Sequence, residues 1–269
     1  MDKIRITALV IASMGIIVSS VMLIRTYNEY RVASIEYEDL NKYTMDITED
    51  EAPKDVEALV VEEDVKVLAR NYNRNDFPDF SVDFEGLYKE NNDYIGWLYV
   101  GSCEISYPVV QGDDNDYYLH NTFEKEANFA GCIFIDFQDE PDFSRFNTFV
   151  YGHAMKNGTM FGSLKKLRKD ENNLKNDPYI YMYLKDGIYR YKIYSYYIDK
   201  KDSEMYNSAD TEEQYRKYLR AALDKSMVDC EVEPSVEDNS ITLVTCQGTG
   251  SNKQRFFVHG TFVDRYLFE

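Results

Sequence analysis

The sequence predicts a mostly β domain with added helices that closes, or nearly closes, into a barrel. From Ser81 onward the chain runs through short stretches of β-branched and aromatic residues separated by turn signals, a pattern typical of barrels. Aromatic residues make up 15% of the chain, with Tyr 24 against Trp 1, and strands favour such residues. A chain of 269 residues can form one substantial domain plus appendages.

The charge balance argues against two classes of partner. Lys+Arg 30 against Asp+Glu 48 gives a formal net charge of −18. Such an acidic chain disfavours binding to nucleic acid, and it disfavours a polybasic patch that would bind a membrane surface.

The cysteines give no sign of a metal site. They are Cys103, Cys132, Cys230 and Cys246, and none forms a C-x-x-C pair. With only three scattered histidines we expect no zinc site, no other metal and no cofactor. Two disulfides could form in an exported protein, although a chain of this length does not need them. We expect the first three cysteines to be structural.

The N-terminus contains a candidate membrane anchor. Residues 6–24 read ITALVIASMGIIVSSVMLI, without a charge. At about 1.5 Å per residue, such a helix just spans a hydrocarbon core of roughly 30 Å. The alternative is a cleaved secretory signal, but residues 21–25 make a poor cleavage site. We predict a cytoplasmic tail over residues 1–5, a single transmembrane signal anchor over residues 6–24, and an exported C-terminal part, since Lys3 and Arg5 favour an inside N-terminus.

Residues 25–80 are predicted to be an acidic stalk or linker. Between Glu36 and Asp64 only Lys42 and Lys54 are basic, and acidic runs are usually solvated. The composition changes at Ser81, so we place the folded domain at residues 81–269.

Helices and strands alternate irregularly within that domain. Helical spacing covers residues 82–91, and helices are also expected at residues 160–167 and, more clearly, 211–227. The β-type runs are residues 95–100, 105–110, 131–136, 148–151, 179–184, 188–198, 240–246 and 255–268.

Three residues at strand ends carry the candidate chemistry. TLVTC (residues 242–246) reads as a buried strand ending on Cys246, and Arg255 begins the next strand. NTFVYGH likewise places His153 where an apolar strand ends. A cysteine nucleophile acts as its thiolate, which a nearby imidazolium stabilises. An arginine keeps its charge and can stabilise an oxyanion.

Each of these residues has a structural alternative. A lone Cys246 is more often a packed core residue, and His153 could be a satisfied strand-end histidine. Arg255 could simply pair with a surface carboxylate. His259 lies on the same strand face as Arg255 and is the rival base, and His120 is a weaker rival.

Four ordered motifs resemble one known family. TLVTC with an arginine on the next strand resembles the sortase signature, TL-x-TC with a downstream Arg. VYGHAMKNGTMFGSL (residues 150–164), IGWLYVGSCEISYPVVQGDDNDYYL (residues 95–119) and GCIFID (residues 131–136) resemble class B sortases. The resemblance covers roughly residues 81–269, and a signal anchor ahead of an extracytoplasmic domain fits the same family.

The resemblance implies an eight-stranded sortase-type β-barrel with N-terminal helices and a long helix between the sixth and seventh strands. It implies a cysteine transpeptidase of Gram-positive cell surfaces. Such enzymes cut a C-terminal sorting signal of the LPXTG or NPXTN kind after its threonine and pass the acyl group to an amine of the cell wall or of a pilin. Carried over by motif, Cys246 is the nucleophile, His153 the general acid/base and Arg255 the oxyanion or substrate clamp.

The resemblance also implies a substrate groove. Asn115 and Leu119 match positions that line the family's sorting-signal groove, and Thr245 would position the catalytic strand. Val244 stands where many class B members carry a serine, and Gln247 where an acidic residue is common. Both of these positions border the substrate, so the preferred sorting motif is open.

Two other classes of function are alternatives to a sortase. A papain-like cell-wall hydrolase also uses cysteine and histidine, but there the cysteine comes first in the chain, whereas His153 precedes Cys246. The other is a membrane-anchored binding module, or a catalytically silent relative, which would neither cleave sorting peptides nor form a thiol adduct.

Overall fold

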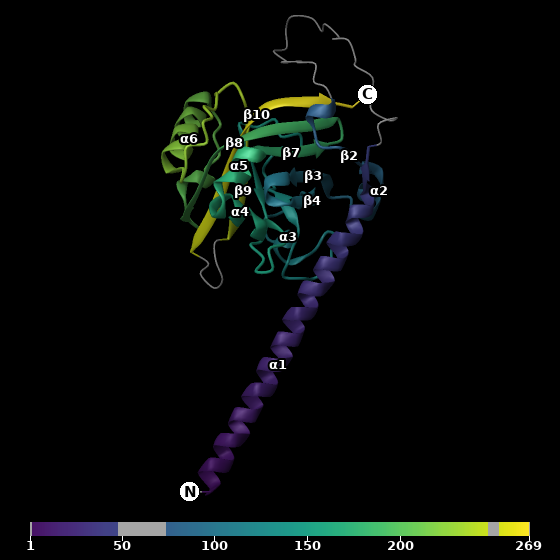
Figure 1. The fold of residues 1–269 in the computed structure, drawn as a ribbon, viewed down its shortest axis with the longest axis vertical. Helices are drawn as coiled ribbons and strands as arrows, with labels where there is room; N and C mark the ends of the chain where they lie inside the picture. The colour runs from purple at the N-terminus through teal and green to yellow at the C-terminus, as the bar shows by residue number, and fades with distance from the viewer. Residues whose placement is uncertain (1, 48–73, 247–252, 269) are drawn as a thin grey trace, which may run out of the picture.

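A computed structural model describes residues 2–47, 74–246 and 253–268. One long helix, α1 (Asp2–Asp39), extends from a closed barrel (Figure 1). The shorter helices are α2 (Phe84–Glu90), α3 (Tyr117–His120), α4 (Lys166–Lys169), α5 (Glu171–Asn176) and α6 (Glu212–Lys225).

Eight strands close the barrel in the order β10-β8-β7-β3-β4-β5-β6-β9. They are β3 (Tyr94–Val100), β4 (Ile105–Val110), β5 (Ile133–Ile135), β6 (Asn147–Tyr151), β7 (Tyr179–Leu184), β8 (Gly187–Lys200), β9 (Ser240–Cys246) and β10 (Gln254–Leu267). The pairs β4–β5 and β6–β9 are parallel, and the others are antiparallel. The predicted barrel is confirmed, and each of the eight predicted β-type runs overlaps one of its strands.

The predicted helix over residues 211–227 is α6, between the sixth and seventh barrel strands, β8 and β9. The Thr211 hydroxyl accepts the N–H of Gln214 at 3.3 Å, and the Gln214 side chain accepts the N–H of Asp210 at 2.9 Å. The first bond satisfies a donor that the first turn of the helix leaves free, and the second satisfies the N–H of the residue before the N-cap. The local sequence thus explains where α6 begins.

The other two predicted helices differ from the expectation in length or in type. The helix predicted over residues 82–91 is α2, which begins after Asp83, whose carboxylate accepts the N–H of Gly86 at 2.9 Å. The helix predicted over residues 160–167 is a 3-10 turn, η4 (Phe161–Lys165), that continues into α4.

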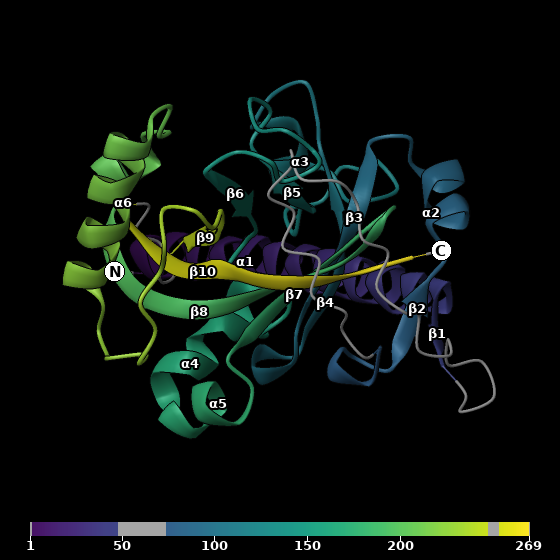
Figure 2. The ribbon, with the colours of Figure 1, turned by 90° about the horizontal axis from the view of Figure 1, so that it is seen from above.

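Two apolar clusters hold these elements together. The larger one contains fully buried residues of the barrel strands, among them Trp97, Leu98 and Leu243. The second joins Tyr215 and Tyr218 of α6 to Val244 of β9 and to other residues of the sheet. Figure 2 shows α6 against one side of the barrel, at the opposite end from α2. Full burial of one large apolar side chain stabilises a fold by about 1.5–3 kcal/mol. The contacts of α6 therefore stabilise the face of β9 that carries Val244.

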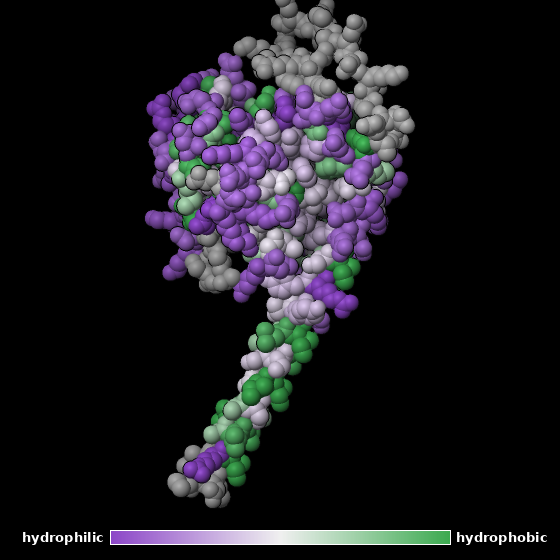
Figure 3. All heavy atoms as spheres, in the orientation of Figure 1, coloured by the Kyte–Doolittle hydropathy of each residue, from purple (hydrophilic) through white to green (hydrophobic). Residues whose placement is uncertain are grey.

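The two halves of α1 differ in their surroundings. Its N-terminal half exposes apolar side chains along its length (Figure 3), and by length and composition α1 could cross a membrane. Its C-terminal half buries Ala33, Tyr37 and Leu40, the last just beyond the helix end. Their spacing places them on one face. This face of α1 is part of the folded core.

Part of the predicted acidic stalk, residues 25–80, is ordered against the barrel. Strand β1 (Thr44–Asp46) pairs antiparallel with β2 (Phe80–Val82), and the side chain of Phe77 is buried. Residues 48–73 lie outside the described residues. The division of the chain into tail, anchor, stalk and domain stays a prediction.

Candidate active site

Two neighbouring strands bring Cys246 and Arg255 together. Cys246 is the last residue of β9, and Arg255 is the second residue of β10. The two residues are register partners in the antiparallel β9–β10 pair. Directly opposite residues have Cβ atoms about 4.5–5.5 Å apart and point to the same face of a sheet. Arg255 as a whole is half-buried, and its guanidinium donates to the carbonyl of Gln254 at 3.1 Å.

His153 reaches the same end of the barrel from β6. Because β6 runs parallel to β9, the two strands leave the core in the same direction, and the N–H of Gly152 donates to the carbonyl of Val244 at 3.2 Å. A Cβ at Gly152 would lie 2.4 Å from the Cδ1 of Ile133 and 2.9 Å from the ring of Phe161. Only glycine fits this close packing, which fixes where His153 leaves the sheet.

The imidazole of His153 is half-buried and held by the backbone. Its Nε2 lies 2.8 Å from the carbonyl oxygen of Leu119. A carbonyl only accepts, so Nε2 carries a proton and Nδ1 is the nitrogen that can gain or lose one. Burial lowers the pKa of His153, the Leu119 carbonyl raises it, and the charges of His120 and Arg255 lower it further; the net pKa is below the ordinary value. This arrangement suits proton exchange at Nδ1.

Two of the candidate groove residues, Val244 and Thr245, are buried in β9. Val244 is buried beside Phe149 and Phe257, in the cluster under α6. Thr245 is also buried, and its hydroxyl has no hydrogen-bond partner among the described residues. Gln247 lies outside the described residues.

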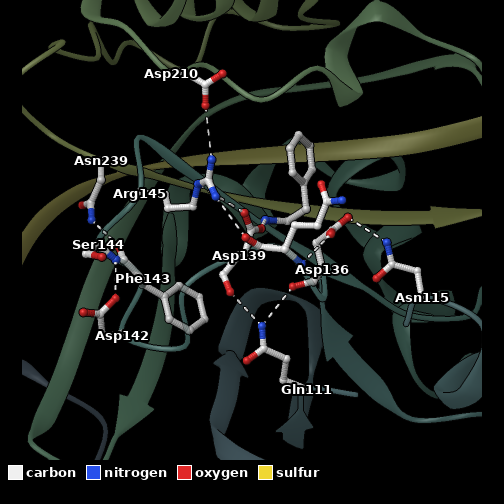
Figure 4. Close-up of polar contacts among 12 residues, drawn as sticks. Gln111, Asn115, Asp136, Asp139, Asp142, Phe143, Ser144, Arg145, Asp210 and Asn239 are labelled. Atoms are coloured by element: carbon white, nitrogen blue, oxygen red, sulfur yellow. Dashed lines mark hydrogen bonds and ion pairs between the residues drawn. The ribbon is translucent and has the colours of Figure 1, made fainter. Parts of the chain in front are cut away.

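Asn115 is held by the residues that follow β5. Its amide nitrogen donates to Asp136 Oδ2 at 2.8 Å, and its amide oxygen accepts the N–H of Phe137 at 3.0 Å. Asp136 Oδ2 also accepts from the hydroxyl of Tyr151 at 3.1 Å. Figure 4 shows Asn115 and Asp136 facing each other, with Gln111 donating to the Asp136 carbonyl at 3.1 Å. Asp136 therefore ties Asn115 to the end of the strand that leads to His153.

A second set of polar contacts joins the β5–β6 loop (residues 136–146) to the β8–α6 connection (Figure 4). Arg145 donates to Asp210 at 3.3 Å and to the carbonyl of Gln138 at 3.0 Å, and its Nε lies 3.9 Å from the carboxylate of Asp139. Asp139 accepts the N–H of Phe149 at 2.8 Å, and burial raises its pKa to about 6.

Aromatic rings line this side of the sheet. Tyr206, from the 3-10 turn η5 (Glu204–Tyr206), lies with its ring centroid 6.4 Å from Tyr151, 6.0 Å from Phe149 and 5.2 Å from Phe257. Phe257 is two residues beyond Arg255 and shares its strand face. An apolar wall of these four rings therefore lies on the strand face that Arg255 shares with Phe257.

The two histidines that could rival His153 as the base, His259 and His120, lie in different surroundings. His259 is fully buried, with Nδ1 2.9 Å from the Thr242 hydroxyl and Nε2 3.0 Å from the Tyr197 hydroxyl, and burial lowers its pKa to about 3. A buried, neutral, fully bonded imidazole is a structural group. His120 is exposed.

The three other cysteines are free thiols. Burial raises the pKa of Cys103 and of Cys132 to about 12, and that of Cys230 to about 11. Thiols of such high pKa are poor nucleophiles. Among the residues that the structure describes, no group of three or more His, Cys, Asp or Glu side chains could hold a metal ion.

Sequence reasoning overlooked two residues of this site. Asp136 ends the GCIFID motif and Tyr151 precedes the glycine before His153, so both lay within quoted motifs. Neither residue received a role from the sequence, because only the fold brings Asp136 to Asn115 and Tyr151 to Asp136.

Comparison with known proteins identifies the family of this chain. The family model described as Sortase domain matches residues 98–263. Sortase B of Listeria monocytogenes serovar 1/2a is 31% identical over 188 residues, which are 68% of this chain and 75% of that protein. Sortase B of Staphylococcus aureus (strain NCTC 8325 / PS 47) is 32% identical over 176 residues, 65% of this chain and 72% of that protein.

Solved structures give the same result. The X-ray structure of Clostridium perfringens sortase B is similar with a TM-score of 0.63 and 34% identity, covering 68% of this chain and 100% of that one. The Staphylococcus aureus sortase B–substrate complex is similar with a TM-score of 0.62 and 30% identity, covering 67% of this chain and 84% of that one.

Proposed function

Because this chain belongs to the sortase family of cysteine transpeptidases, we propose that it cuts a C-terminal sorting signal of the LPXTG or NPXTN kind after its threonine. The acyl group then passes to an amine of the cell wall or of a pilin. The observation that carries this proposal is the register of β9 and β10, which sets Arg255 opposite Cys246, at the end of the barrel where His153 leaves β6.

In the proposed reaction the thiolate of Cys246 attacks the threonine carbonyl. Arg255 stabilises the negative charge that develops on the carbonyl oxygen. His153 Nδ1–H protonates the leaving amine as the peptide bond breaks, which leaves a thioester on Cys246. The acceptor amine then attacks the thioester, His153 takes up its proton, and the thiolate is released.

The proposed groove runs along the wall described above. Its residues are Asn115, Leu119, Val244, Thr245 and Gln247. The bond between the Leu119 carbonyl and His153 supports the place of Leu119 in this assignment. For Staphylococcus aureus sortase B a substrate complex is known, and the match to it covers 67% of this chain and 84% of that one.

The proposed partners are surface proteins with such sorting signals and an amine acceptor from peptidoglycan or a pilin. We place the enzyme in the cell membrane as a single-pass protein with residues 81–269 as the sortase catalytic domain on the extracellular face. The exposed apolar residues of α1 support an anchor over residues 6–24.

A peptide-library cleavage profile tests the function. The full chain in detergent, mixed with LPXTG-, NPXTN- and SPXTG-type peptides and an added amine, is expected to cleave after threonine and to form the transfer product. Val244→Ser and Gln247→Glu variants, which restore the residues common in class B members, should change the preferred motif while the cleavage position stays after threonine. Absence of both cleavage and a thioester adduct across the library would refute the proposal.

The surroundings of His153 predict the acidic limb of the pH profile. The reactive thiolate–imidazolium pair carries the same single proton as the resting pair of neutral thiol and imidazole, so both forms are lost when His153 of the resting pair takes up a second proton at low pH. Since the pKa of His153 is lowered from 6.5, the acidic limb of kcat/KM for peptide cleavage should lie below pH 6.5. In a His120→Gln variant one charge that lowers this pKa is gone, so the limb should move to higher pH. A limb above pH 6.5 in the unmodified chain, or one that His120→Gln moves downward, would contradict this assignment.

A further inference from the structure

The juxtamembrane half of α1 is bonded to the loop that leads to the candidate active site. The α3–β5 loop (residues 121–132) lies against α1 at several points. The carboxylate of Glu36 accepts the N–H of Glu124 at 3.0 Å, and the Asn128 side chain donates to the Glu29 carbonyl at 3.1 Å. The ring of Tyr30 meets that of Phe129 edge-on, with centroids 4.8 Å apart.

The deepest of these contacts is made by Tyr37. Its hydroxyl donates to the carbonyl of Gly131 at 2.6 Å, and the whole side chain is buried. Burial raises the pKa of Tyr37 well above its ordinary value, so the hydroxyl stays a donor across the working pH range. A buried carbonyl that loses its donor is costly, so this bond fixes the position of Gly131.

Gly131 in turn packs directly onto the backbone beside His153. It has a φ of 60°, and a Cβ there would lie 2.5 Å from the carbonyl oxygen of Tyr118 and 3.0 Å from that of Leu119. The N–H of Cys132, the next residue, donates to the Tyr118 carbonyl at 2.9 Å. Gly131 is therefore closely packed against the Leu119 carbonyl. Because close-packed atoms transmit displacements, a shift of Gly131 would move that carbonyl.

The Leu119 carbonyl is the group that holds His153 Nε2 at 2.8 Å. A continuous path therefore runs from the Tyr37 hydroxyl through Gly131 and the Leu119 carbonyl to the imidazole. Each step is a hydrogen bond or a contact with no space for a methyl group.

We propose that Tyr37 is a positioning residue for His153, so that the helix emerging from the predicted anchor is part of the active-site scaffold. This inference rests on the proposed function for the role of His153. Tyr37 does not touch the reacting atoms; it sets the position of the Leu119 carbonyl, which orients the imidazole ring and fixes its tautomer.

The test is Tyr37→Phe in the full chain in detergent. The ring stays and only the hydroxyl is removed. A weaker Leu119–His153 bond lowers the pKa of His153, so we expect the acidic limb of kcat/KM to move down by about half a pH unit. We expect kcat to fall severalfold, with KM unchanged, because the peptide groove is intact. In ¹⁵N NMR of the histidine rings, the His153 titration should move in the same direction, while the ring signals of the buried His259 stay in place.

Tyr30→Phe is the matched control. It removes a hydroxyl from the same helix, one that has no hydrogen-bond partner among the described residues, and it should leave both readouts unchanged. Glu36→Gln, which keeps an acceptor for the Glu124 N–H, checks that the loop tolerates conservative change. If Tyr37→Phe folds with an unchanged Tm and leaves the His153 titration where it was, the inference is wrong. The NMR readout needs no catalysis, so a failure of the proposed function would not be mistaken for a failure of this one.

Discussion

Replacing Cys246 with alanine is expected to abolish cleavage and transfer, with a loss in kcat of about 10⁴-fold or more, comparable to removal of a nucleophile in other acyl-transfer enzymes. Without the thiol no acyl-enzyme can form, and the remaining His153 and Arg255 have nothing to activate or stabilise. The measurement is peptide cleavage followed by mass spectrometry, with a trapped thioester sought in the unmodified chain.

The chain offers a close control for that experiment. Cys230 is a half-buried free thiol whose pKa burial raises to about 11, so Cys230→Ala should retain full activity. A thiol-directed alkylating reagent should inactivate the unmodified chain and the Cys230→Ala chain at the same rate. Cleavage by Cys246→Ala at more than a trace level would show that the nucleophile lies elsewhere.

Replacing Arg255 with lysine is expected to lower kcat/KM about 100-fold, near the cost of one oxyanion-hole donor. The positive charge remains, but lysine has a single rotatable ammonium in place of a rigid planar fork. Because β9 and β10 hold Arg255 opposite Cys246, the loss should appear mainly in kcat if the guanidinium acts on the oxyanion. It should appear mainly in KM if the guanidinium clamps the bound peptide.

Arg265 provides the comparison on the same strand. It lies near the far end of β10, where it donates to the Tyr189 hydroxyl at 3.1 Å. Arg265→Lys should keep the activity, while any cost should fall on the thermal midpoint. Equal effects of the two substitutions on kcat/KM would mean that Arg255 has a structural role only.

The packing of α1 also bears on how the enzyme should be prepared. A fragment beginning at Ser81 would lack β1, the buried face of α1 and the bond from Tyr37 to Gly131. It would expose the apolar surface that these elements cover. We expect such a fragment to be less stable than the full chain.

The sequence alone was sufficient to predict the barrel strands and α6, and it supplied the three candidate catalytic residues as a prediction. β-branched and aromatic runs between turn signals predict strands because they fit a pleated, half-buried surface. The Thr211 and Gln214 pair marks a helix start because its side chains satisfy nearby backbone groups, which is a local effect. The motifs around His153 and Cys246 could be read without knowing how the chain folds.

The tertiary structure decided which distant segments meet. Local periodicity carries no information on the parallel pairing of β6 with β9, and that pairing brings His153 to the end of the barrel where Cys246 lies. The bond from Asp136 to Asn115 joins residues 21 positions apart. The bond from Tyr37 to Gly131 joins residues 94 positions apart, from a segment that read as a solvated stalk. Such contacts depend on the geometry of the closed barrel. The sequence pattern of a single helix or strand does not determine that geometry.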